Sequence, residues 1–547
     1  MKKLSVLDCT LRDGGRIIDC NFDDSVIVGV GKQLHRAGID IIELGFLRDN
    51  INFNGNSTFF SCIEDADKYV EKISGRADES IYVLFVDYGL YDVYKLKPVN
   101  GIGIRGIRFG FTQNDFRNHK DELIKAMNYI KKMGYLLFFQ DVNTPGYEND
   151  ELNDIIDIAN NLKPVSFGIV DTYGSMYLDD FEKVWNAVDT RLDKNIAIDF
   201  HSHNNMQMSF ALTQRLINLA IDRDIIIDAT LNGMGKCAGN LNTELIVDFL
   251  SRKMDFNYDV DTILDAIDSY IYPIKKKCDW GYTVPAFIAG IYKSHPNNII
   301  YLTEKYRLNN KDIKYIISGI EKEKRQRYDY DNIQRIYKEY SAGAIDDELC
   351  IEKLTSIFRG KNVLVMAPGS SIESCRREIL QYINNYHPIV VSVNFLPKYC
   401  EADFYFYANT IYWEKISENV PRGKCIISSN VHMDTKGTYI VNYSSLIAED
   451  SPLYDNSTIM LLNLLKTLEV AEIHLAGFDG LGEGNNYIDN SFPNAKAGLK
   501  NDEINLEITK LLVSFCHKTK DEIVLSFLTP SIYKEKMKEV GEGYNCD

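Results

Sequence analysis

The stretch Ile196-Ala-Ile-Asp-Phe-His-Ser-His203 begins as an apolar run and ends with two histidines that are two residues apart. The run is nearly continuous in apolar residues, as expected for a strand that is buried on both faces. On a β-strand, residues i and i+2 point to the same side, so His201 and His203 can hold one metal ion. Taken alone, however, the pair is equally typical of ordinary turn residues.

A second apolar run, Leu4-Ser-Val-Leu7, is followed by Asp8-Cys-Thr-Leu-Arg-Asp-Gly14. This segment supplies an acid, Asp13, and a permanent cation, Arg12. If this run and the histidine run end on one rim of a parallel barrel, Asp13 completes a three-ligand metal site and Arg12 stands beside the ion. Mixed imidazole and carboxylate ligands suit a divalent ion with open positions, and we expect Mg²⁺ or Mn²⁺.

Strand-like runs recur eight times in the first half of the chain, with helix-like segments between them. The runs are Leu4–Cys9, Ile39–Phe46, Ile81–Asp87, Gly106–Phe111, Leu136–Val142, Val165–Asp171, Ile196–His201 and Ile225–Leu231. Eight such units over this length predict a (β/α)8 TIM barrel in the α/β class. The alternative is a doubly wound open sheet, which rarely needs eight units.

Polar residues stand at the carboxyl ends of these runs, where a TIM barrel carries its catalytic groups. Glu43 lies in the second run and Asp171 ends the sixth, and we expect both to bind substrate. Asp87 and Asp141 are more typical of helix caps or satisfied loop groups. Polar groups at so many strand ends favour a functional rim.

The eighth run leads into Asn232-Gly-Met-Gly-Lys-Cys-Ala-Gly-Asn240, whose three glycines let the backbone approach a ligand closely. Asn240 can place an amide oxygen on the metal. Cys237 can act as a mobile acid or base. The alternative for Cys237 is a small buried thiol in a tight turn, because the sequence identifies no activating partner.

Three motifs, Asp8-Cys-Thr-Leu-Arg-Asp-Gly14, His201-Ser-His203 and Gly233-Met-Gly-Lys-Cys-Ala-Gly-Asn240, follow one another in this order. Together they resemble the metal-dependent lyase superfamily of hydroxymethylglutaryl-CoA lyase, 4-hydroxy-2-oxovalerate aldolase and isopropylmalate synthase. The resemblance covers about residues 1–290 and looks closest to the oxovalerate aldolase branch. It implies that Arg12 stabilises an enolate and that the metal is held by Asp13, His201 and His203, with Asn240 as a fourth ligand.

One residue departs from that branch, because Arg16 stands where the aldolases carry a histidine base. A guanidinium stays protonated and is a poor base, so we expect Arg16 to grip a substrate carboxylate or phosphate. Tyr282 falls near the position of the site tyrosine of the aldolases. Tyr292 competes for that position, and a packing tyrosine is a further alternative.

The resemblance implies a carbon–carbon lyase whose small-molecule substrates are a 2-oxo acid and an aldehyde. Removing a proton from the 4-hydroxyl of a 4-hydroxy-2-oxo acid cleaves the adjacent bond and leaves a pyruvate-type enolate. The metal and Arg12 are expected to stabilise that enolate. The alternative is a Claisen-type acyltransferase that uses an acyl-CoA on the same barrel.

Two further parts are predicted beyond the barrel domain of residues 1–290. Residues 291–360 are helical and charged, which is typical of a linker or of a dimerisation region in a homodimer. Residues 361–547 alternate strands and helices as a Rossmann-like α/β domain. This domain resembles bacterial surface-glycan transferases, which implies a nucleotide-sugar ligand and a bifunctional protein. A scaffold without its own catalysis is the alternative.

The composition of the chain indicates a multidomain globular protein and argues against several other classes. A chain of 547 residues with 45% apolar and 25% charged residues is expected to form two or three globular domains. Its net charge of −17 argues against nonspecific binding to nucleic acid or to an anionic membrane. No apolar stretch has the length of a membrane span. The eleven scattered cysteines, without a signal peptide, predict reduced thiols in the cytoplasm.

Overall fold

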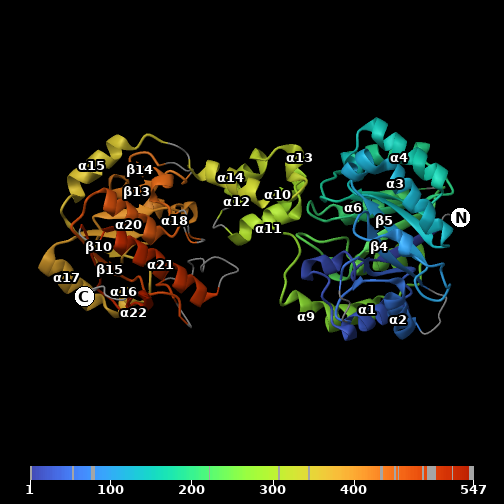
Figure 1. Ribbon diagram of the computed structural model, residues 1–547, viewed down its shortest axis with the longest axis horizontal. Coiled ribbons are helices and arrows are strands. Elements are labelled where there is room, and N and C mark those ends of the chain that lie inside the picture. Colours follow the sequence, from blue (N-terminus) through green and yellow to red (C-terminus); the bar gives the residue numbers. More distant parts are fainter. Residues whose placement is uncertain are drawn as a thin grey trace. The chain divides into compact units, whose positions relative to one another are not determined.

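The computed structural model describes residues 3–540 apart from 52–54, 75–79, 221, 306–307, 309, 343–344, 432–434, 449–450, 452, 454, 483–485, 489–499 and 520–521. The chain divides into two compact units (Figure 1), namely Met1–Ile299 with Lys322–Tyr328, and Ile300–Glu321 with Asp329–Asp547. The chain passes between the units within the segment 291–360, and the described part of that segment is largely helical. None of the described helices is both long enough and apolar enough to cross a membrane.

The first unit is built on a closed barrel of eight parallel strands. β1 (Leu4–Asp8) pairs with β2 (Ile41–Leu47) on one side and with β9 (Ile225–Ala229) on the other, which closes the sheet. Between β9 and β2 the order is β8 (Ala197–Ser202), β7 (Ser166–Asp171), β6 (Leu136–Asp141), β5 (Gly106–Phe111) and β4 (Ile81–Asp87), and a short β3 (Phe59–Phe60) adds to β2. The predicted TIM barrel is confirmed, and every predicted run overlaps one of these strands, although β2 and β8 each extend one residue beyond the predicted run.

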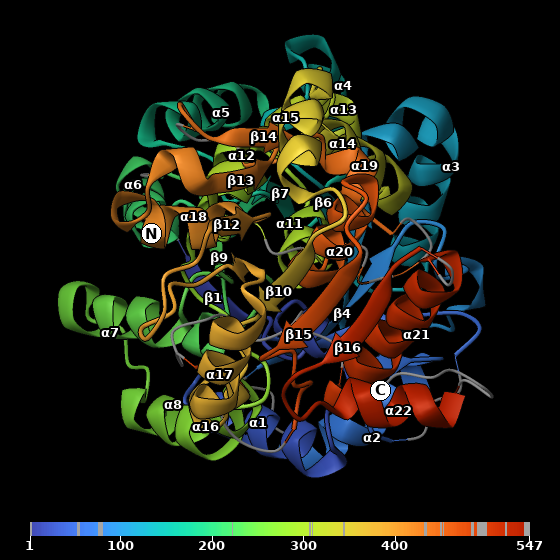
Figure 2. The same cartoon turned by 90° about the vertical axis from the view of Figure 1, so that its left-hand side faces the viewer.

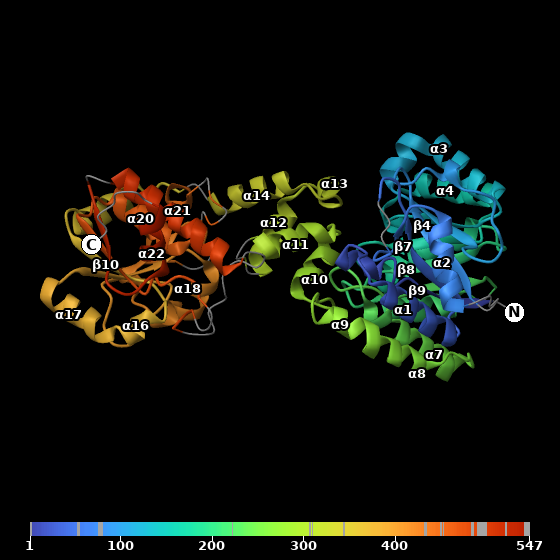
Figure 3. The same cartoon turned by 60° about the horizontal axis from the view of Figure 1, so that its bottom comes forward.

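Amphipathic helices surround the barrel (Figure 3). They bury apolar side chains against the strands, as α1 does with Ile27, Val30 and Leu34, which recur at helical spacing. The helices between and after the strands are α1 (Asp24–Arg36), α2 (Ile63–Ser74), α3 (Gln113–Lys132), α4 (Asn149–Leu162), α5 (Leu178–Arg191), α6 (Ser209–Leu219), α7 (Thr243–Met254), α8 (Val260–Ala266) and α9 (Tyr272–Lys275). The helices α10 (Val284–Tyr292), α11 (Pro296–Lys305), α12 (Asn310–Gly319), α13 (Lys322–Arg325), α14 (Tyr330–Ala342) and α15 (Glu348–Phe358) follow.

Side chains fill the barrel in layers because every second residue of a strand points inward. Ile41, Phe138 and Ile226 belong to a buried apolar cluster. These residues lie on β2, β6 and β9. Two residues further along each of these strands, the barrel interior is polar, and β5 and β8 each add one polar residue to this layer. It consists of Glu43, Arg108, Gln140, Asp199 and Asp228, all buried. His201 lies two residues beyond Asp199, so the predicted metal ligands sit directly above this polar layer.

The second unit holds a sheet of seven parallel strands (Figure 2). Its order is β14 (Tyr439–Val441), β13 (Cys425–Ser428), β12 (Phe404–Tyr407), β11 (Ile389–Val393), β10 (Asn362–Met366), β15 (Glu472–Ala476) and β16 (Val524–Phe527). Its helices are α16 (Ser371–Ser374), α17 (Arg376–Tyr386), α18 (Thr410–Ile416), α19 (Tyr443–Leu446), α20 (Ser457–Thr467), α21 (Asn501–Thr519) and α22 (Ile532–Val540). The strand order reverses between β10 and β15, and such a point is where parallel sheets bind ligands. The predicted α/β class is confirmed for this half of the chain, while residues 541–547 of the predicted domain lie outside the described residues.

Candidate active site

The three predicted metal ligands meet at the carboxyl end of the barrel. Asp13 follows β1, and His201 and His203 lie at the end of β8, with one ligating atom from each within 4.8 Å of the others. The Nε2 atoms of His201 and His203 are 4.0 and 3.8 Å from Asp13 Oδ2. Asn240 Nδ2 donates to the same oxygen at 2.9 Å. Asn240 Oδ1 is buried and has no hydrogen-bond partner among the described residues.

The charges of these groups fit a divalent cation. Burial lowers the pKa of His201 and of His203 to about 4, so both imidazoles are neutral near pH 7. Burial alone would raise the pKa of Asp13, but Arg12 and the two histidines hold it well below its usual range. Two neutral imidazoles, a carboxylate and an orphaned amide oxygen form a donor set that a divalent ion accepts.

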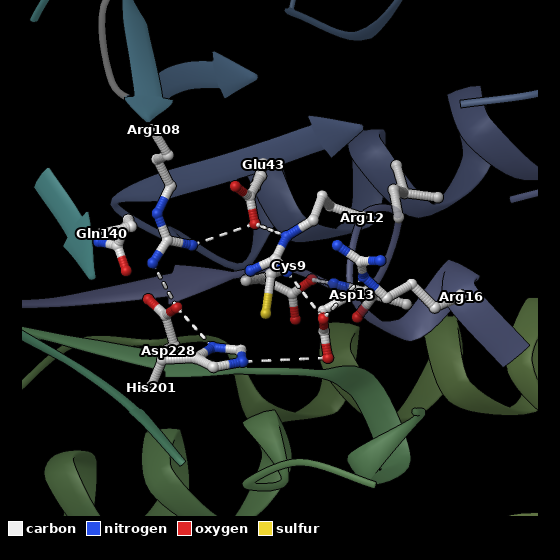
Figure 4. A network of polar contacts seen from close by, with 12 residues as sticks. Cys9, Arg12, Asp13, Arg16, Glu43, Arg108, Gln140, His201 and Asp228 are labelled. Carbon is white, nitrogen blue, oxygen red and sulfur yellow. Dashed lines mark hydrogen bonds and ion pairs between the residues drawn. The ribbon is translucent and has the colours of Figure 1, made fainter. Parts of the chain in front are cut away.

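A second group of potential ligands, Cys9, His201 and Asp228, shares one histidine with the first. Two of these potential ligand atoms already contact each other, because His201 Nδ1 lies 2.8 Å from Asp228 Oδ2. Burial raises the pKa of the Cys9 thiol well above its usual range, which disfavours the thiolate that a metal requires. The contact with Asp228 leaves His201 Nε2 on the side of Asp13 (Figure 4).

Arg12 is a fixed cation beside these residues. Its Nη1 lies 2.7 Å from Asp13 Oδ1, and its Nε lies 2.6 Å from Glu43 Oε2. Its guanidinium carbon is 4.5 Å from the centre of the Phe85 ring. Glu43, predicted to bind substrate, holds Arg12 through one oxygen, while its Oε1 is buried without a hydrogen-bond partner in the described structure.

Arg108 lies at the centre of the polar layer, with its side chain 0% exposed, and the sequence analysis missed it. It donates to Glu43 Oε2 at 3.1 Å, Asp199 Oδ2 at 3.1 Å and Asp228 Oδ2 at 2.5 Å. It therefore links the Glu43–Arg12 side of the site to the Asp228–His201 side (Figure 4). The available signal was a single arginine inside the apolar run Gly106–Phe111, because a buried charge requires charged partners.

Arg16 and Asp171 were both predicted to bind substrate, and their surroundings differ. Arg16 Nε lies 3.4 Å from Asp13 Oδ1, and its side chain is 38% exposed, so it reaches the rim of the site. Asp171 is buried, and its two oxygens accept the backbone N–H groups of Ser175 and Met176 at 3.0 Å each. The carboxylate of Asp171 therefore orders the loop after β7.

Cys237 and Tyr282, the other predicted catalytic residues, belong to neighbouring segments. Cys237 has a left-handed φ of 54°, and burial raises the pKa of its thiol to about 12, so it stays protonated. The Gly281 amide donates to the Cys237 carbonyl at 3.1 Å, which joins the segment of Tyr282 to the glycine-rich loop. The Tyr282 side chain points largely into solvent, with 56% exposure.

His295, between α10 and α11, is a second residue that the sequence analysis missed. Its Nδ1 accepts the backbone N–H of Asn297 at 3.1 Å, so the neutral ring carries its proton on Nε2. Burial, with the charges of Lys236, Arg16 and His203, lowers the pKa of His295 to about 4. A neutral imidazole therefore lies within electrostatic reach of the site. No spacing in the sequence pointed to it.

Comparison with known proteins agrees with this geometry. The family model described as HMGL-like matches residues 106–269, which contain His201, His203 and Asn240. The barrel contains an HMGL-like domain. The resemblance that the three motifs predicted is therefore confirmed for the barrel.

Two relatives of the HMGL-like barrel show how far the similarity extends. The chain is 25% identical over 272 residues to a 2-isopropylmalate synthase of Lactococcus lactis, covering 47% of this chain and 49% of the synthase. It is 23% identical over 324 residues to a 4-hydroxy-2-oxovalerate aldolase of Carboxydothermus hydrogenoformans, covering 57% of this chain and 90% of the aldolase. The chain thus spans about half of the synthase and most of the aldolase. The crystal structure of an HMG-CoA lyase of Bacillus subtilis is 18% identical with a TM-score of 0.40, covering 51% of this chain and 94% of the lyase.

Proposed function

We propose that the HMGL-like barrel is a divalent-metal-dependent aldolase that makes or breaks a carbon–carbon bond of a 4-hydroxy-2-oxo acid. The convergence of Asp13, His201 and His203 beside the fixed cation Arg12 carries this proposal. These three residues, with Asn240 Oδ1 as a fourth ligand, would hold Mn²⁺ or Mg²⁺. The similarity to proteins named 4-hydroxy-2-oxovalerate aldolase supports the same reaction class.

Each residue around the proposed metal site can be given a role in this reaction. A bound ion would supply Lewis acidity at the keto oxygen of the 2-oxo acid. Arg12, locked between Asp13 and Glu43, presents a cation where the charge of the enolate develops. Arg16 stays protonated, so we do not assign it as the base. His295 Nδ1 already accepts the Asn297 N–H, so we assign to its Nε2–H a hydrogen bond to the 4-oxygen of the substrate, where negative charge develops as the carbon–carbon bond breaks. The protonated thiol of Cys237 is our candidate for the acid that protonates the enolate. We assign no step to Tyr282.

Exchange of the pyruvate methyl protons for deuterium tests this proposal without an aldehyde. The full-length protein is incubated with pyruvate in D₂O, with Mn²⁺ or with a chelator, and the methyl signal is followed by proton NMR. We expect exchange that depends on the metal and that falls at least 100-fold in Asp13→Asn, with the melting temperature as a control for folding. Exchange at the wild-type rate in Asp13→Asn, or in the presence of the chelator, contradicts the proposal.

The similarity to 2-isopropylmalate synthase favours a second candidate, a Claisen-type acyltransferase. This reaction would use the same metal ligands but would release free CoA from an acyl-CoA. Incubation with acetyl-CoA and a series of 2-oxo acids, followed by a thiol reagent, separates the two reactions. Stoichiometric release of CoA with one 2-oxo acid favours the acyltransferase. Release no faster than without protein favours the aldolase.

We also propose that the second unit binds a nucleotide-sugar in its own cavity. A cavity lies at the carboxyl ends of β10 and β15, where the strand order reverses. Asn394 lines this cavity with a left-handed φ of 62°, and its Oδ1 is buried without a hydrogen-bond partner in the described part of the chain. An acceptor without a donor is expected to bind a ligand N–H or O–H group.

Titration calorimetry with UDP- and CMP-sugars tests this second site. The matched variant is Asn394→Gly, because glycine keeps the left-handed backbone and removes only the amide. We expect the full-length protein to bind one of these ligands at least tenfold more tightly than the variant does. Equal affinities, or no binding at millimolar ligand, contradict a nucleotide-sugar site.

A further inference from the structure

Arg48 follows β2 at the mouth of the barrel, and the aldol chemistry proposed above does not use it. Its Nη2 lies 2.6 Å from Asp87 Oδ2, and Arg16 Nη2 lies 3.7 Å from the same oxygen. One carboxylate therefore holds two guanidinium groups side by side. Both belong to the rim on which Asp13 stands, since Arg16 also approaches Asp13 at 3.4 Å.

A third guanidinium completes this arrangement. The guanidinium carbons of Arg12, Arg16 and Arg48 lie 5.8, 4.7 and 5.1 Å from the centre of one ring, that of Phe46. An aromatic face attracts cations, but it carries no net charge with which to balance them. The three cations therefore share a small, partly buried region in which their mutual repulsion is weakly screened.

Three carboxylates, those of Asp13, Asp87 and Glu43, contact the three arginines, but several of these contacts are shared or long. Asp13 and Asp87 each contact two of the guanidinium groups, and Glu43 divides its single bonded oxygen between Arg12 and Arg108. Arg48 Nε is buried without a hydrogen-bond partner in the described structure. A divalent ion at Asp13 would add further positive charge. Arg48 Nε–H and the guanidinium of Arg16, whose ion-pair distances are 3.4 and 3.7 Å, therefore remain able to donate to an anion that enters the mouth of the barrel.

We propose that Arg16 and Arg48 bind an anionic group, a phosphate or a carboxylate, at the far end of the aldehyde substrate. This inference rests on the proposed aldolase function, in which the metal takes the 2-oxo acid and Arg12 takes the enolate. The paired N–H groups of a guanidinium can bind two oxygens of a phosphate or of a carboxylate. Asp87 holds the guanidinium groups of Arg16 and Arg48 in place before the substrate binds. The acceptor is therefore an aldehyde that carries a negative charge.

Selectivity between matched aldehydes tests the anion site. Aldol addition to pyruvate is measured with glyceraldehyde 3-phosphate against glyceraldehyde, and with succinic semialdehyde against butanal. We expect kcat/KM to be at least 100-fold higher for one of the charged aldehydes than for its neutral partner. This ratio should fall at least tenfold in Arg48→Gln and in Arg16→Gln, because a folding defect would lower both members of a pair alike. In Arg252→Gln, an exposed arginine on α7, the ratio should not change.

Direct binding gives a measurement that does not depend on catalysis. Titration of the metal-free protein with inorganic phosphate and with succinate should show binding to at least one of them that weakens at least tenfold in Arg48→Gln. Which of the two binds distinguishes a phosphate from a carboxylate. A charged-to-neutral ratio near one, or no binding of either anion, overturns the inference. Failure of pyruvate exchange instead overturns the aldolase proposal, so the two failures are distinguishable.

Discussion

His201 Nδ1 lies 2.8 Å from Asp228 Oδ2, and the same oxygen lies 2.5 Å from Arg108 Nη2. An ionised carboxylate can only accept, so His201 must carry its proton on Nδ1. The lone pair on Nε2 is then directed to the side of Asp13, where the proposed metal binds. The orientation of one ligand is therefore determined by a charged layer beneath it.

Replacing Asp228 with asparagine should weaken metal binding. The amide can still contact the ring, but it no longer fixes the tautomer, and the loss of such a support typically costs 10- to 100-fold in metal affinity. The Kd for Mn²⁺ is measured by titration calorimetry on the full-length protein. Asp222→Asn, which affects an exposed partner of Lys194, is the control and should bind as the wild type does. An unchanged Kd in Asp228→Asn would mean that a contact other than Asp228 determines the tautomer of His201.

Replacing Arg108 with methionine should destabilise the barrel. The substitution leaves Asp199, Asp228 and Glu43 buried without their shared cation, and the loss of one partner of a buried ion pair costs about 3–5 kcal/mol. Urea denaturation followed by tryptophan fluorescence measures the change. Arg191→Met removes an exposed pair with Asp157 and should cost less than about 1 kcal/mol. Similar losses in the two variants would show that the layer is not held by charge.

The sequence predicted the parts of the fold and site that depend on local pattern. The barrel strands are buried on both faces, so their runs were visible, and the spacing of His201 and His203 follows from the two-residue period of a strand. Arg108 was missed because its partners are 65 to 120 residues away along the chain. His295 was missed because it comes from a loop beyond the last barrel strand. Such contacts depend on tertiary packing rather than on spacing.

Asp141, at the end of β6, should make the barrel less stable as the pH rises. The residue is fully buried, neither carboxylate oxygen has a hydrogen-bond partner among the described residues, and burial raises its pKa well above the usual range. A raised folded-state pKa means that stability is lost as the pH climbs from the unfolded pKa, near 4, to the folded value. The loss is about 1.4 kcal/mol for each pH unit between those two values. Asp141→Asn mimics the protonated acid and should not lose this stability.

Calorimetric melting of the wild type and of Asp141→Asn at pH 4, 6 and 8 tests this expectation. The variant should melt close to the wild type at pH 4 and increasingly above it at pH 6 and 8. Asp154→Asn, at an exposed site on α4, corrects for the change in net charge. A difference that is constant across the three pH values would show that Asp141 does not titrate on unfolding.

His295→Leu should remove the proposed hydrogen-bond donor while leaving the metal site intact. Loss of one donor to a developing oxyanion typically lowers kcat by about 10²- to 10³-fold, and cleavage of a 4-hydroxy-2-oxo acid should fall by that amount. The Kd for Mn²⁺ should change less than threefold, because His295 is not among the proposed ligands. His119→Leu, at an exposed histidine on α3, controls for the loss of an imidazole. If His295→Leu retains more than a tenth of the wild-type kcat, another group donates to the 4-oxygen. If its metal affinity falls with its activity, His295 acts on the ion rather than on the substrate.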